Sequence, residues 1–241
     1  MSITWAICRR DLLAAFTTPL AWLVLACWSL LTNGVFVRTL ERVHGTPGDE
    51  VPLAVDALYL GVFFLSLLAP AITMTSFAAE RSQGTMQLLL TVPIREHQLV
   101  IGKFLASFLV LAALVVTTLV HPLVLLLVSQ VNVPHLLAGY LGLLLACALY
   151  AALGTWISLL VDSPVAAYVL TFAAIAVLLI IGLAGSESWL HRVGEALGLG
   201  VRSGPFFRGE VRLGNVLYFA GGTAACLVMA HAALCARRIH G

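Results

Sequence analysis

Long apolar runs, separated by short polar connections, are the feature that most constrains the fold. We place six of them at about residues 19–37, 55–78, 101–129, 135–160, 165–184 and 215–236. A hydrocarbon core about 30 Å thick needs about 20 apolar residues in helical form. Helices suit this solvent because they satisfy their own backbone polar groups. We therefore predict an all-α, polytopic membrane protein with six transmembrane helices, forming a single transmembrane domain over residues 1–241.

Composition supports this class and argues against several others. The chain is 61% hydrophobic and 10% charged, whereas soluble domains average about 45–50% apolar and about 25% charged residues. The net charge is only +2 and no Lys/Arg tract occurs, so we expect the lipid bilayer and not nucleic acid as a partner. The five cysteines form no CxxC pair, so neither a disulfide framework nor a zinc site is indicated.

The positive charges favour, by a narrow margin, an orientation with both termini in the cytoplasm. An even number of spans puts the two termini on one side of the membrane. Arg9 and Arg10 precede the first span, and Lys103, Arg237 and Arg238 lie close to span ends on that same side. An excess of Lys and Arg marks the cytoplasmic side.

Residues 1–18 form a candidate surface helix ahead of the first span. Apolar residues recur there at near-helical spacing, at Ile3, Ile7, Leu12, Leu13 and Phe16. Such a segment tends to lie flat at the interface, with its apolar face in lipid and Arg9 and Arg10 against phosphates. Pro19 allows a sharp turn into the first span. We predict an elbow helix; the alternative is a first span that simply starts early.

The segment from Ala79 to Lys103, AERSQGTMQLLLTVPIREHQLVIGK, is a polar island between two apolar runs. The preceding span ends at Glu80 and Arg81, and Gly84 is a helix stop. A short apolar helix candidate follows, and Pro93 breaks it before the next span. A short helix held at both ends by breakers has the right shape to fit a socket on a soluble partner.

The sequence contains no recognisable catalytic motif. The Gly102-Lys103 pair is followed by Phe104 and lacks the upstream glycine of a P-loop, so we expect no ATP site in this chain. No HExxH or Gly-x-Ser-x-Gly pattern occurs, and we predict no catalytic residue and no metal site. His121 is the one ionisable residue well inside a span. It is either satisfied by carbonyls that Pro122 frees, or part of a transport or proton path.

The island resembles the cytoplasmic loop of type-two ABC transporter permeases. The elements that match in order and spacing are Glu80-Arg81, Gly84-Thr85, Leu88-Leu89-Leu90, Pro93 and Gly102-Lys103. Gln87 departs from the pattern, since the family often has glutamate after Gly-Thr-x.

Two further segments resemble the gliding-motility-type subfamily of these permeases. One is ICRRDLLAAFTTPLAWLVL at residues 7–25, where Asp11 replaces the commoner glutamate. The other is PFFRGEVRLGNVLYF at residues 205–219. Asp162-Ser163-Pro164 departs from the subfamily, which usually has a Gln-containing turn there.

The resemblance implies a bacterial inner-membrane permease subunit, with export as the expected direction. ATP and Mg would be bound by separate cytoplasmic ATPase subunits, and this chain would bind no cofactor. A second permease copy or homologue would complete the membrane part. Residues 185–214 would be an external segment, which either meets a membrane-anchored accessory protein or forms a re-entrant or interfacial loop.

The resemblance also assigns roles to individual residues. Coupling to the ATPase, within residues 79–100, would involve Glu80, Arg81, Gly84, Thr85, Leu88, Leu89 and Pro93. The elbow helix would use Arg9, Arg10, Asp11 and Phe16, and the external segment Phe206, Arg208, Gly209 and Tyr218.

Two other functions are compatible with parts of the sequence. A mechanotransmission or scaffold subunit would use the same loop to pass force to periplasmic or accessory partners without moving substrate. The weakly polar spans suit that function. An integral membrane enzyme acting on lipid would need paired carboxylates or a metal constellation, and the sequence shows neither.

Overall fold

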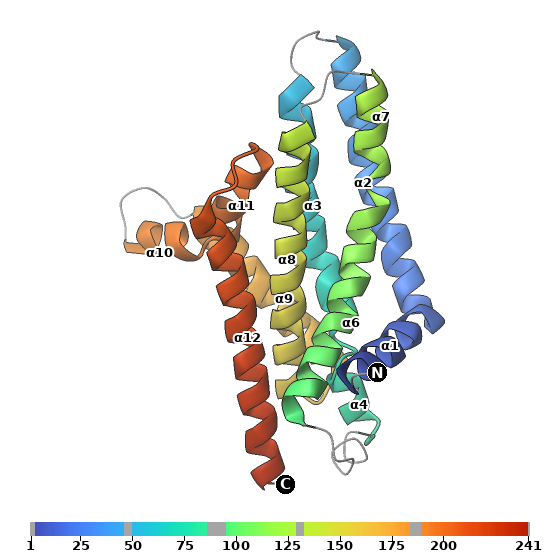
Figure 1. The fold of residues 1–241 in the computed structure, drawn as a ribbon, viewed down its shortest axis with the longest axis vertical. Helices are drawn as coiled ribbons and strands as arrows, with labels where there is room; N and C mark the ends of the chain where they lie inside the picture. The colour runs from blue at the N-terminus through green and yellow to red at the C-terminus, as the bar shows by residue number, and fades with distance from the viewer. Residues whose placement is uncertain (1–2, 46–49, 86–94, 129–132, 184–188, 241) are drawn as a thin grey trace.

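The computed structural model describes residues 3–45, 50–85, 95–128, 133–183 and 189–240, and their regular structure is helical throughout (Figure 1). In chain order the elements are α1 (Ile3–Thr17), α2 (Pro19–Gly45), α3 (Glu50–Thr73), α4 (Ala78–Ser82), α6 (Glu96–Thr117), α7 (Val120–Val128), α8 (Val133–Leu160), α9 (Pro164–Ile180), the 3₁₀ turn η1 (Ile181–Leu183), α10 (Trp189–Leu197), α11 (Leu199–Phe207) and α12 (Leu213–His240). The predicted all-α class is confirmed.

Five helical stretches in the described residues are long and apolar enough to cross a membrane. They are Pro19–Arg38, Leu58–Ser82, Glu96–Val124, Val133–Leu160 and Leu213–Ala236. The remaining predicted span, 165–184, is represented by α9, an apolar helix of only 17 residues that continues into η1. The protein is thus a multi-pass membrane protein, with five long spans and one shorter apolar helix where six spans were predicted.

One predicted connection is wrong, because helix replaces loop in it. Residues 38–54 are polar and rich in Gly and Pro (HGTPGDEVP), a composition that predicts a flexible loop, yet α2 continues to Gly45 and α3 begins at Glu50. Nothing obliges a helix to end at the membrane surface, since its own hydrogen bonds continue into water. The long connection at 185–214 likewise contains α10 and α11.

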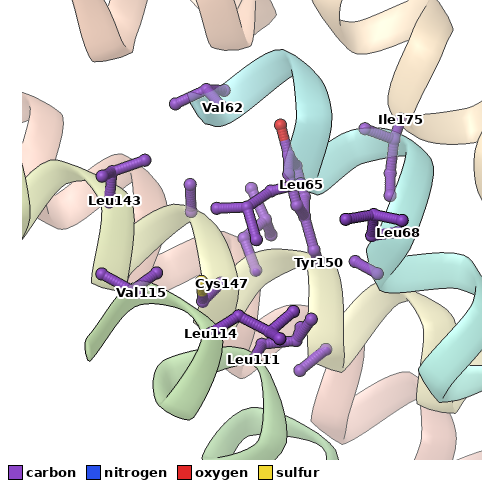
Figure 2. Close-up of a cluster of buried hydrophobic side chains, with 14 of the residues drawn as sticks. Val62, Leu65, Leu68, Leu111, Leu114, Val115, Leu143, Cys147, Tyr150 and Ile175 are labelled. Atoms are coloured by element: carbon purple, nitrogen blue, oxygen red, sulfur yellow. The ribbon is translucent and has the colours of Figure 1, made fainter. Parts of the chain in front are cut away.

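Helix α8 lies at the centre of the bundle and packs against α3, α6, α9, α11 and α12 (Figure 1). Small residues on α8 permit these close approaches, as they do in membrane helix pairs generally. At Gly154 an added Cβ would clash with the side chain of Thr73 on α3. Leu65, Leu111, Tyr150 and Ile175 bring α3, α6, α8 and α9 together in one fully buried cluster (Figure 2).

The third span is broken between α6 and α7 at Thr118 and Leu119. Pro122 has no N–H to donate to the carbonyl four residues earlier, which is that of Thr118. The hydroxyl of Tyr140 on α8 donates to this carbonyl instead, at 3.0 Å. The break therefore costs no unsatisfied backbone group at this position.

The backbone N–H of His121, beside this break, also donates to the Thr118 carbonyl at 3.0 Å, whereas its imidazole contacts α2. Its Nε2 lies 3.0 Å from Asn33 Oδ1, and its ring stacks on Phe36 with centroids 4.6 Å apart. The imidazole is thus a contact between the first and third spans.

Candidate functional site

Four charged side chains meet at the end of the bundle where both termini lie. Arg10 and Asp11 come from α1, Glu80 from α4 and Lys103 from α6. In Figure 1, α1 lies across this end of the bundle beside α4 and the start of α6. We call these four residues the base network.

Lys103 is the centre of the base network. Its side chain is 2% exposed, and its Nζ lies 3.1 Å from Asp11 Oδ2, 2.9 Å from Glu80 Oε1 and 2.6 Å from the carbonyl oxygen of Ser76. An ammonium has three N–H donors, so each has an acceptor here. Such pairing is what allows a charged group inside an apolar helix bundle. The Phe77 ring, 5.0 Å from Nζ, adds a cation–π contact.

Arg10 joins both acids from the outer side of the network. Its Nη2 lies 2.7 Å from Asp11 Oδ1 and 3.0 Å from Glu80 Oε1, while its side chain stays 51% exposed. Burial disfavours the charged guanidinium, but the hydrogen bond to Asp11 and the charges of Asp11 and Glu80 outweigh burial, so the pKa of Arg10 is raised. These contacts bind α1 to α4 across a sequence separation of 70 residues.

Helix α8 holds the start of α4 through one hydroxyl. Ser158 Oγ accepts hydrogen bonds from the backbone N–H groups of Phe77 at 3.0 Å and Ala78 at 2.9 Å. The first N–H groups of a helix have no partner within it. Ser158 supplies that partner from a neighbouring span, so α4 cannot shift along α8 without breaking both bonds.

Arg81, on α4, in turn binds the end of α8. Its Nη1 donates to the carbonyl of Leu159 at 3.2 Å, and its Nε lies 2.7 Å from Asp162 Oδ1. The last carbonyls of a helix lack internal partners and carry partial negative charge. The two helices therefore cap each other, α8 through Ser158 and α4 through Arg81.

The predicted helix stop at Gly84 is confirmed. Gly84 has φ +71°, its N–H donates to Arg81 O at 3.0 Å, and the N–H of Thr85 donates to Glu80 O at 2.9 Å. This pair of bonds around a left-handed residue is a Schellman motif, which glycine permits without strain. The predicted coupling residues Leu88, Leu89 and Pro93 lie outside the described residues.

Helix α1 covers the predicted elbow and turns at Thr18 into α2. The Trp22 indole N–H donates to Phe16 O at 2.9 Å, with the two rings edge to face. One expectation is wrong: Ile7 was assigned to the lipid-facing side, but it is 7% exposed. It packs on Gly102 of α6, where an added Cβ would lie 2.9 Å from Ile7 Cγ2.

The predicted external residues lie at the other end of α8, around α11. Phe206 is fully buried and meets Phe219 edge to face at 6.2 Å. Gly209 has φ +80°, which suits the tight turn between α11 and α12. The Tyr218 hydroxyl donates to Leu197 O at 2.6 Å, whereas Arg208 is exposed. Phe206, Gly209 and Tyr218 thus hold this segment in place.

Sequence reasoning missed several members of the site at the base. The sequence assigned no role in the site to Ser158, Ser76 or Asp162. Lys103 was treated as the mark of a span end, although α6 begins at Glu96 and Lys103 lies almost two turns inside it. A lysine that deep in an apolar helix requires a partner, and that requirement is the signal that could have found the network.

The matches to known proteins agree with this architecture. Residues 48–193, well over half of the chain, match the family described as ABC-2 family transporter protein. The chain belongs to the ABC-2 transporter family. The matched range includes Glu80, Lys103 and Ser158 of the site just described.

A curated relative supports the same assignment. The Pseudomonas aeruginosa protein named "Probable ABC transporter permease protein NosY" is 29% identical over 113 residues, which cover 46% of this chain. The match spans 41% of the length of that relative, less than half. ABC-2 permeases are typically non-enzymatic transmembrane subunits, and the family implies an ATPase partner in general. The narrower resemblance to gliding-motility-type permeases stays a prediction.

Proposed function

We propose that this ABC-2 permease is the transmembrane subunit of a bacterial inner-membrane exporter, driven by a separate cytoplasmic ATPase. ATP and Mg would be bound by that partner and not by this chain. The observation that supports the proposal is the base network. It ties the segment that leaves the second span, residues 79–85, to α1 and α6, and the bond from Arg81 Nη1 to Leu159 O ties the same segment to α8.

These ties give a route for force through the protein. A push on the predicted coupling segment, 79–100, would reach α1 through Arg10 and Glu80 and α6 through Lys103. It would reach α8 through Ser158 and Arg81. Each tie is a short polar contact that resists displacement, so α4 would move with three helices and not slide past them.

The proposal includes a topology with six spans and both termini in the cytoplasm. The 17 residues of α9 rise about 26 Å at 1.5 Å per residue, and the three residues of η1 add about 6 Å at 2 Å per residue. Together they match a hydrocarbon core of about 30 Å. A second permease copy or homologue would complete the membrane part, and residues 185–214 would contact an accessory protein on the outside.

Co-purification tests the coupling assignment. The tagged chain, extracted from its native membrane in mild detergent, should bring down an ABC ATPase at about one per permease. Leu89→Asp places a charge in the predicted coupling helix and should abolish this recovery. Leu197→Asp is the matched control, because Leu197 is exposed on α10, which lies away from α4 and the base network (Figure 1). Equal ATPase recovery with both variants would contradict the proposal.

Cysteine labelling tests the topology. In a background in which the five native cysteines are replaced, Gln83→Cys and Val211→Cys place thiols at exposed positions at opposite ends of the bundle. An impermeant maleimide should label position 211 in cells whose outer membrane has been opened. Position 83 should react only after the inner membrane is permeabilised. The reverse pattern would invert the proposed orientation.

A further inference from the structure

A crevice of about 410 Å³ lies beside the base network, bounded by α1, α3, α4 and α6. One part of its wall is polar, formed by Arg10, Asp11, Thr18, Thr75, Ser76, Glu80, Gln83, Lys103 and Ser107. Another part is apolar, formed by Ala14, Ala15, Ile72, Ala79, Ala106 and Val110. The crevice thus combines charged and hydrocarbon-like surfaces, as an amphiphile does.

Two buried polar atoms on its polar wall have no hydrogen-bond partner among the described residues. They are Ser76 Oγ and Glu80 Oε2, and Ser76 as a whole is only 8% exposed. Lys103 cannot serve them, because its three N–H groups already contact Asp11 Oδ2, Glu80 Oε1 and Ser76 O. Leaving such atoms unpaired is costly, so the site calls for a donor from outside the chain.

The charges of the base network limit which kind of molecule can supply that donor. Two acids and two bases make the base network neutral overall, which disfavours an occupant with a large net charge. The carboxylate oxygen Glu80 Oε2 favours a cationic N–H donor. Arg10, 51% exposed at the same crevice, can still contact an anionic group. A primary ammonium joined to a phosphate has a small net charge, a cationic N–H donor for Glu80 Oε2 and an anionic group for Arg10.

We propose that this crevice binds an aminophospholipid, with the ammonium on Glu80 and Ser76 and the phosphate at Arg10. The apolar wall fits the first part of an acyl chain. From Lys103 to Val110 on α6 there are seven residues, a depth of about 10 Å. The inference rests on the proposed function in one respect, namely that α1 lies at the membrane surface where headgroups are found.

The binding of three lipids with different headgroups tests whether the crevice selects an ammonium group. Phosphatidylethanolamine carries an ammonium with N–H donors, whereas the quaternary ammonium of phosphatidylcholine has none. Phosphatidylglycerol carries a net negative charge and no ammonium. The purified full-length chain in detergent should therefore retain phosphatidylethanolamine in preference to both others when binding is measured by native mass spectrometry.

Ser76→Ala is the decisive variant. It removes a hydroxyl that has no described partner and keeps the backbone carbonyl that Lys103 uses. Loss of one hydrogen bond to a charged group should weaken phosphatidylethanolamine binding about tenfold. Ser66→Ala is the matched control on the preceding helix α3, since the Ser66 hydroxyl already donates to Phe63 O at 2.6 Å and does not line the crevice. The control should bind like the parent chain.

A second variant tests the acyl-chain wall without touching the charges. Ala106→Leu fills the apolar part of the crevice and should reduce retention of phosphatidylethanolamine to the level of phosphatidylcholine. Soluble phosphoethanolamine, added in excess, should displace the lipid only weakly if the acyl chain contributes, and fully if the headgroup alone is bound.

Two outcomes would overturn the proposal. One is equal retention of phosphatidylethanolamine and phosphatidylcholine, and the other is parent-like binding by Ser76→Ala. Either would show that the crevice does not select an ammonium group through Ser76. Because the assay contains no ATPase, its failure would leave the coupling proposal standing, and a failed ATPase co-purification would leave the lipid result standing.

Discussion

Each end of the bundle is stabilised by a different kind of interaction. At the base, ion pairs join residues far apart in the chain: Lys103 and Asp11 are 92 positions apart, and Arg10 and Glu80 are 70 apart. At the opposite end, the ion pair between Arg212 and Glu210 spans only two positions. There the tertiary contacts combine aromatic packing, with Phe206 and Phe207 fully buried, and neutral hydrogen bonds such as that of Tyr218 with Leu197 O.

This difference separates two mechanical roles. Ion pairs and capping bonds have strict geometry, so they transmit a displacement from one element to the next. Aromatic packing fixes shape but tolerates small sliding of one surface over another. On the proposed function, the base network would move as a unit with α4, whereas the α11 end would stay closed around α8.

The largest effect on stability should come from the aromatic end. Phe206→Ala removes a fully buried ring that packs on Gly142 and Phe219, and should cost about 4 kcal/mol of unfolding free energy. Thermal unfolding in detergent measures this loss. Phe63→Ala is the control, since Phe63 is 58% exposed and should cost under about 1 kcal/mol. ATPase recovery should survive Phe206→Ala, because the base is untouched.

Breaking the base network should lower both stability and ATPase recovery. Lys103→Ala leaves Asp11 and Glu80 facing each other with only Arg10 between them, and should cost about 3 kcal/mol. Both acids are about one-fifth exposed, which keeps the loss at the low end for a buried pair. ATPase recovery should also fall.

The control for this second change is Arg208→Ala, at an exposed position of the opposite end. It should alter stability by less than about 0.5 kcal/mol. If Lys103→Ala and Arg208→Ala unfold at the same temperature, the base network does not stabilise the fold and the contrast between the two ends fails.

The sequence could predict features that depend on neighbouring residues, but not those that depend on contacts between distant parts of the chain. Span positions came from local apolar runs, and Gly84 was found because a left-handed turn is a local requirement. The ion pairs could not be found this way, since Lys103 selects Asp11 and Glu80 only after α1 folds back across α6. Helices α10 and α11 were missed because short amphipathic helices among glycines and polar residues lack the long apolar signal of a span.

A smaller effect should come from the cap between α8 and α4. Ser158→Ala leaves the buried N–H groups of Phe77 and Ala78 without their acceptor, and should cost about 2 kcal/mol. Thr155→Val is the matched control one turn earlier on α8, because its hydroxyl donates only to Ala151 O within the same helix. A loss with Ser158→Ala that does not exceed the control would show that the cap is dispensable.

The smallest effect separates the two contacts of Arg81. Asp162→Asn removes the charge that faces Arg81 Nε, but Asp162 is 81% exposed, so the ion pair should contribute less than about 0.5 kcal/mol. The bond from Arg81 Nη1 to Leu159 O remains in this variant. Arg81→Ala, which removes both contacts and uncaps α8, should cost more than Asp162→Asn in the same unfolding assay. Equal losses would assign the tie to the surface ion pair, and the base would then weaken at high salt while the aromatic end would not.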